Sequence, residues 1–130
     1  MKNYFSEAEQ SCNCCGLVRL GVGFLDKLNQ LREKVGLPFK INSMCRCPKH
    51  NAKEGGKPNS FHLTSHPWGC CAVDISIRGW SSSNVWKLVA EAAAAGWSIG
   101  VNFQHSFIHL DRRVDYAASG WKTPAFFPYY

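Results

Sequence analysis

Two histidines and an aspartate, His62, Asp74 and His109, are the side chains of this 130-residue sequence best suited to hold a metal ion. Three ligands of this type hold a catalytic zinc ion and leave its fourth position open for water. Asp74 interrupts an apolar segment, 72–77, in which an unpaired buried carboxylate would cost several kcal/mol. A positive group must therefore face Asp74, and either a metal ion or an arginine would satisfy it.

His109 lies in a second apolar segment, Phe107-Ile108-His109-Leu110. A histidine in such a strand is more often a hydrogen-bonded core residue than a metal ligand. Two unexpected polar groups on separate strands nevertheless support each other, and together they favour a metal site.

The hydrophobic pattern predicts one α+β domain over residues 1–130, with two main helices and a mostly antiparallel sheet. The helices are expected within residues 21–36 and at about 84–95. The strands are expected at 39–43, 72–77, 97–101 and 106–110. Residues from 44 to about 71 form one long predicted loop that carries candidate ligands, and residues from about 116 to 130 form a predicted irregular aromatic tail.

Composition excludes several classes of protein. Aromatic residues make up 13% of the chain and charged residues 18%, which excludes collagen, long coiled coils and intrinsic disorder. No apolar run approaches the roughly 18 residues that span a bilayer, and acidic residues stand where a secretory signal would be apolar, so we expect neither feature. The net charge of +6 comes from scattered basic residues, which makes nucleic acid an unlikely partner. We expect a monomer.

Seven cysteines fall in three clusters, at residues 12–15, 45–47 and 70–71. They suit structural zinc ligands, disulfide partners or buried free thiols, and the sequence leaves all three open. Only Cys12 and Cys15 have the spacing of common zinc ribbons, and no second such pair follows. A cross-link or metal clip from this cluster to Cys45 or Cys47 would fix the long loop to the start of the chain.

Four motifs in order resemble the zinc D-alanyl-D-alanine carboxypeptidases and related murein endopeptidases, including small bacteriophage forms. That family has Ser-x-His-x-x-Gly-x-Ala-x-Asp followed by Phe-(Val/Ile)-His-(Val/Leu)-Asp. The matching segments here are 43–56 with its arginine, Ser60-Phe61-His62-Leu63, Ala72-Val73-Asp74-Ile75 and Phe107-Ile108-His109-Leu110-Asp111. The resemblance covers the chain from about Tyr4 to Arg113.

The spacing of the first two ligands departs from the family. Members have six residues between the first zinc histidine and the aspartate, whereas eleven separate His62 from Asp74. His66 would leave seven and would keep a His-x-x-Gly sequence. We prefer His62, because it keeps the Ser-x-His-Leu context and makes 65–69 a loop insertion.

The resemblance implies a Zn²⁺ ion held by His62, Asp74 and His109, and hydrolysis of peptide bonds in the stem peptides of peptidoglycan. It implies that Arg46 and Ser60 bind the substrate. Relatives have a glutamate or histidine as general base shortly before the last zinc histidine, where this chain has Ser106 and Phe107.

Two other residues are candidates for moving the proton. Asp111 lies two residues beyond His109 and either takes up a proton or orients a ligand; His105 is the other candidate. Because the family's usual base is missing, the alternative function is that of a non-catalytic binding module. Such a module would be stabilised by zinc or cysteines and would bind cell wall or nucleic acid.

Overall fold

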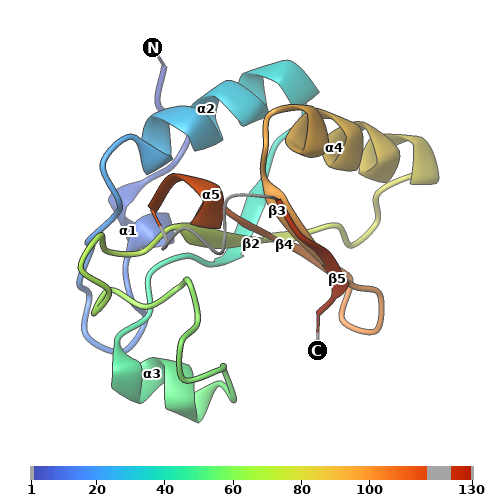
Figure 1. Cartoon of the computed structure of the whole chain (residues 1–130). Coiled ribbons are helices and arrows are strands. Elements are labelled where there is room, and N and C mark those ends of the chain that lie inside the picture. Colours follow the sequence, from blue (N-terminus) through green and yellow to red (C-terminus); the bar gives the residue numbers. More distant parts are fainter. Residues whose placement is uncertain (1, 117–123, 130) are drawn as a thin grey trace.

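The computed structural model describes residues 2–116 and 124–129, and it forms an α+β domain (Figure 1). The helices are α1 Glu7–Gln10, α2 Phe24–Val35, α3 Pro48–Lys53, α4 Ser82–Ala94 and α5 Arg113–Tyr116. The strands are β1 Lys40–Ser43, β2 Ala72–Ser76, β3 Ser98–Asn102, β4 Phe107–Asp111 and β5 Phe126–Pro128. The two long helices and four of the strands confirm the elements predicted from the hydrophobic pattern.

The five strands form one sheet in the order β1-β2-β4-β3-β5. All neighbouring pairs are antiparallel except β3 and β5, which are parallel. The central strands β2 and β4 pair so that Asp74 lies directly opposite His109. Side chains at directly paired positions lie on the same face of a sheet, so this register alone brings two of the candidate ligands together.

Helices α2 and α4 lie next to each other over the sheet (Figure 1). Gly36 ends α2 in the left-handed conformation, with φ 72°, which a glycine adopts without strain. Ser81 begins α4 by accepting a hydrogen bond from the backbone N–H of Asn84. Under the helices, the rings of Phe24 and Trp97 meet edge to face with centroids 5.7 Å apart in the fully buried core.

The predicted single loop over 44–71 is wrong in one respect, because it contains α3. Pro48 occupies the start of this helix, and the Cys47 sulfur accepts a hydrogen bond from the backbone N–H of His50. The helix has only six residues, too few to show a helical period in the sequence. The remaining loop is tied down by an isolated bridge between Arg46 and Leu63.

The predicted irregular tail over 116–130 also needs correction, since part of it forms β5 at the edge of the sheet. Phe127 packs directly over Gly100 of β3, where an added Cβ would stand 2.6 Å from its ring. The missing side chain of Gly100 therefore makes room for β5, a reason that the tail's own sequence does not reveal. Residues 117–123 and 130 of the tail lie outside the described residues.

The short helices α1 and α5 were not predicted either, since four residues carry no periodic signal. In the part of the chain that the structure describes, none of the helices is long and apolar enough to cross a bilayer.

Candidate metal centre and cleft

His62, Asp74 and His109 meet in the interior of the protein, although Asp74 lies twelve positions after His62 and thirty-five before His109 in the sequence. Asp74 and His109 are paired on β2 and β4, and His62 reaches them from the loop before β2. The Nε2 atom of His62 lies 3.1 Å from Oδ1 of Asp74, and Nδ1 of His109 lies 3.0 Å from the same oxygen. All three side chains are buried, and their ligand atoms lie within 4.8 Å of one another.

Hydrogen bonds on the outer sides of the two rings determine which nitrogens carry protons. Nδ1 of His62 lies 2.7 Å from the backbone carbonyl of Met44, and Nε2 of His109 lies 2.8 Å from Oδ2 of Asp111. A carbonyl and a carboxylate only accept, so each of these nitrogens must donate. In the neutral rings the lone pairs of His62 Nε2 and His109 Nδ1 then face the carboxylate of Asp74. This electron-rich arrangement fits a divalent metal ion of the zinc type.

In the absence of metal, burial and the close contact of His62, His109 and Asp74 shift the pKa values of all three side chains. Burial lowers the pKa of His62 and keeps this ring neutral. Burial opposes protonation of His109 too, but hydrogen bonds to Asp111 and Asp74 raise its pKa to about 9. The pKa of Asp74 falls well below its usual range despite burial, because both histidines face it. A proton on His109 thus balances Asp74, and a metal ion would take the place of that proton.

Arg46 satisfies the other oxygen of Asp74. Its Nη2 lies 3.1 Å from Oδ2 of Asp74, and its Nε donates to Oγ of Ser43 over 2.9 Å. The backbone N–H of Arg46 donates to the carbonyl of His62, which holds the two segments together. The two positive partners considered for Asp74 therefore have separate oxygens: the arginine occupies Oδ2, and Oδ1 is left to the two histidines and a cation.

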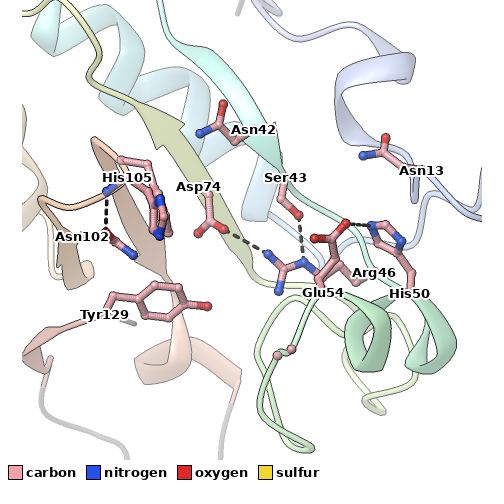
Figure 2. A pocket seen from close by; sticks show the side chains of 13 residues that line it. Asn13, Asn42, Ser43, Arg46, His50, Glu54, Asp74, Asn102, His105 and Tyr129 are labelled. Carbon is pink, nitrogen blue, oxygen red and sulfur yellow. Dashed lines mark hydrogen bonds and ion pairs between the residues drawn. The ribbon is translucent and has the colours of Figure 1, made fainter.

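A cleft of about 450 Å³ opens onto this centre (Figure 2). Asp74 and Arg46 line its floor, and His105 and Tyr129 lie on its opposite wall from α3 (Figure 2). A second hollow of about 350 Å³ reaches His109, and Tyr129 lines both spaces. The two hollows therefore open the centre to solvent at Asp74 and at His109.

The remaining predicted site residues take different places around the centre. Ser60 lines the second hollow, and its Oγ accepts a hydrogen bond from the backbone N–H of His62 over 3.2 Å. His105 is exposed in the turn between β3 and β4 and lines the main cleft. Asp111 is fully buried on the side of the His109 ring away from Asp74. Arg113 donates hydrogen bonds to both carboxylate oxygens of Asp111. Burial alone would raise the pKa of Asp111, but these hydrogen bonds and the one from His109 lower it to about 2.

His66, the alternative to His62 in the sequence, lies outside the cluster. Its ring stacks on Trp68 with centroids 4.5 Å apart, and its Nε2 donates to the carbonyl of Ser60 over 2.8 Å. The structure brings His62, and not His66, to Asp74.

Tyr129 is a site residue that the sequence did not indicate. Its ring stacks on His109 with centroids 4.4 Å apart and planes 10° from parallel. Burial and the nearby charge of Asp74 raise the pKa of Tyr129 to about 12, so the phenol remains protonated. The sequence shows a high density of aromatic residues at the end of the chain, but this density does not place Tyr129 in the site until β5 is known to join the sheet.

Comparison with protein families gives one match that covers most of the chain. The family described as Peptidase M15 matches residues 3–111, a span that contains all of the metal-centre residues and ends at Asp111. Neither the curated proteins nor the solved structures contain a match to this sequence.

Proposed function

From the premise that the chain belongs to the Peptidase M15 family, whose members are zinc peptidases, we propose that it hydrolyses peptide bonds in the stem peptides of peptidoglycan. The bond is either the one before a terminal D-alanine or an internal bond to a D-amino acid. The family carries the metallopeptidase assignment, and the choice of peptidoglycan is our proposal.

The observation that carries the proposal is the convergence of two imidazole nitrogens and one carboxylate oxygen at a point where Asp74 lines a polar cleft and His109 lines a second hollow. Zinc bound by His62, Asp74 and His109 would activate a water molecule and polarise the scissile carbonyl. Three protein ligands leave room for that water, and the two hollows give access to it.

Arg46 and Ser60 are the proposed substrate-binding residues. The Arg46 guanidinium uses Nη2 for Asp74 and Nε for Ser43, Nη1 has a long contact of 3.4 Å with Asn51, and the Tyr129 hydroxyl on the facing wall also contacts this guanidinium. Its remaining N–H groups therefore suit a substrate carboxylate or carbonyl in the cleft. Ser60 would contact the peptide from the second hollow, next to His109.

His105 and Asp111 have different proposed roles in moving protons. His105 lines the cleft and is exposed, so it has access to the attacking water and to the leaving amine. Asp111 is enclosed by His109 and Arg113, and it acts as a positioning residue that fixes the tautomer of His109. This division supplies a proton acceptor although Ser106 and Phe107 stand where relatives have a glutamate or histidine.

The net charge of +6 supports a substrate that is part of an anionic polymer. Bacterial cell walls provide such a polymer, and stem peptides end in the free carboxylate that an arginine recognises.

Mass spectrometry of muropeptides incubated with the zinc-loaded protein tests the proposal. We expect loss of a terminal D-alanine or cleavage of a cross-link, and no product with His109→Ala. His66→Ala is the matched control, because it removes a histidine of the same loop region without touching the cluster, and it should retain zinc and activity. A protein that binds zinc stoichiometrically but leaves every muropeptide intact would instead be a binding module.

A further inference from the structure

Four cysteines from two segments distant in the sequence gather beside the main cleft and form no part of the His62–Asp74–His109 centre. Cys12, Cys14 and Cys15 lie in the turn after α1, and Cys47 precedes α3. We propose that these four thiols bind a second Zn²⁺ ion, which is structural and clips the start of the chain to the loop that carries Arg46. This site is independent of the proposed peptidase activity.

The sulfur positions fit a tetrahedral zinc ion. The Sγ atoms of Cys12, Cys15 and Cys47 all lie within 4.8 Å of one another. Zinc–sulfur bonds of about 2.3 Å place the sulfurs of a tetrahedral site roughly 3.8 Å apart, so only a small contraction is needed. Cys14 is the proposed fourth ligand, because its thiol already contacts that of Cys47; its sulfur is not within 4.8 Å of all three others, so its exposed side chain must turn inward on binding.

The backbone around Cys12 is arranged for a thiolate. The chain reverses between Cys12 and Gly16, whose N–H donates to the Cys12 carbonyl over 2.7 Å, and Gly16 has φ 74°. The Cys12 sulfur accepts a hydrogen bond from the N–H of Cys47 at 3.3 Å, and the N–H groups of Cys14 and Cys15 point to it as well. Such N–H groups compensate the negative charge of a sulfur ligand.

A backbone N–H group also favours the thiolate of Cys47, because its sulfur accepts a hydrogen bond from the N–H of His50 in the first turn of α3. The positive charge of Lys49 lies near Cys14 and favours the thiolate form of that cysteine. It would offset part of the negative charge that four thiolates leave on one divalent ion. On binding, each thiol releases its proton to solvent, and the metal keeps its oxidation state.

Metal binding explains the arrangement better than disulfides do. The sulfurs of Cys12, Cys15 and Cys47 are all mutual neighbours, as the ligands of one metal ion are, whereas disulfides would pair all of them only with Cys14 as the partner of one. Cys14 and Cys15 are exposed, so a metal ion can reach the cluster from solvent. The other cysteines, Cys45, Cys70 and Cys71, are buried in the core and belong to no such group among the described residues.

A metal ion bound by these cysteines would affect the main cleft, because two residues next to the cysteines line it. Arg46 directly precedes Cys47, and Asn13 stands within the cysteine turn and lines the main cleft (Figure 2). A metal ion between the two segments would therefore hold one wall of the cleft and the arginine at its floor in fixed relation.

Metal analysis of the full chain, purified in the presence of a reductant, tests this inference. We expect two zinc ions per chain in the wild type, one in His109→Ala and one in Cys15→Ser. Cys15 is exposed, so its substitution leaves no cavity in the core. Cys71→Ala, which removes a buried cysteine outside the cluster, is the control and should retain two. X-ray absorption of the His109→Ala protein should show a sulfur shell at about 2.3 Å.

Other results overturn the inference. A single zinc ion in the wild type and none in His109→Ala would exclude the second site. In protein isolated without the reductant, a mass deficit from disulfides among the four residues would replace the metal by a cross-link. For the fourth ligand, Cys14→Ser should reduce the number of sulfurs in the shell, and an unchanged shell would remove Cys14 from the site.

Discussion

The carboxylate of Asp111 is fully buried and contacts the ring of His109 on the side away from Asp74. Its Oδ2 accepts a hydrogen bond from Nε2–H of the ring over 2.8 Å, so in the neutral ring the lone pair of Nδ1 faces Asp74. Its own charge is compensated by Arg113, whose Nη2 lies 2.7 Å away. A change at Asp111 therefore alters the metal site through the tautomer and orientation of one ligand.

We predict that Asp111→Asn weakens zinc binding at the His62–Asp74–His109 centre by roughly 10–100-fold, the usual cost of losing such a supporting hydrogen bond. The amide nitrogen of asparagine cannot accept from the imidazole, and its oxygen is a weaker acceptor than a carboxylate. Competition with a chromophoric chelator measures the affinity, and circular dichroism checks that the variant is folded. An unchanged affinity in a folded variant would show that Asp111 has no positioning role.

At this scale the sequence was informative where a polar residue interrupted an apolar strand. Asp74 and His109 stood out for that reason, and the structure brings both to one point. Tyr129 did not, because a tyrosine in an aromatic tail is ordinary, and its stacking on His109 depends on a strand pairing between segments far apart in the chain.

Among the elements, β5 places an aromatic side chain over the metal centre. It pairs with β3, and the backbone N–H of Tyr129 donates to the carbonyl of Val101 over 2.9 Å. The pairing depends on Gly100, where any side chain would meet the ring of Phe127. Parallel pairing at an edge leaves little signal in a three-residue segment, which explains why the sequence predicted an irregular tail.

We predict that Gly100→Ala displaces β5 from the sheet, because the new Cβ would lie 2.6 Å from Phe127 and 3.0 Å from Tyr129. The amide of Tyr129 should then exchange its hydrogen much faster, while amides of the central pair β2 and β4 remain protected as an internal control. Hydrogen exchange followed by mass spectrometry or NMR measures both. Equal protection of Tyr129 in the two proteins would mean that β5 tolerates the methyl group.

Over the whole molecule, ion pairs connect segments from opposite ends of the chain. Lys27 of α2 lies 2.6 Å from Asp115 of α5, and Arg112 donates to the same carboxylate over 2.8 Å. Burial alone would raise the pKa of Asp115, but these hydrogen bonds lower it. The lowered pKa means that the ionised form stabilises the fold.

We predict that Asp115→Asn lowers the free energy of unfolding by about 1 kcal/mol at neutral pH. The contribution of a carboxylate with a lowered native pKa is complete above its unfolded pKa of about 3.9 and is lost as the pH falls below it. The difference between variant and wild type should therefore shrink below about pH 4. Urea denaturation of both proteins across this range measures it, and a constant difference at all pH values would contradict the assignment.

The α+β class, the central strands and the two long helices followed from the hydrophobic pattern, because periods of two and 3.6 residues are visible over segments of this length. The approach of the first cysteine cluster to Cys47 was also expected, from the clustering of the cysteines. The short helices and the parallel edge strand were not. Each depends on contacts between segments distant in sequence, such as the bridge between Arg46 and Leu63 that positions the long loop.

The location of bound zinc shows most directly whether His62, Asp74 and His109 form the metal site. An anomalous difference map of zinc-loaded crystals, measured at the zinc absorption edge, should show a peak about 2.0–2.2 Å from Nε2 of His62, Oδ1 of Asp74 and Nδ1 of His109. A water molecule facing the cleft should complete the coordination. The account would be contradicted by a zinc-loaded protein with no peak between these three atoms, or by an ion there with a fourth protein ligand in place of water.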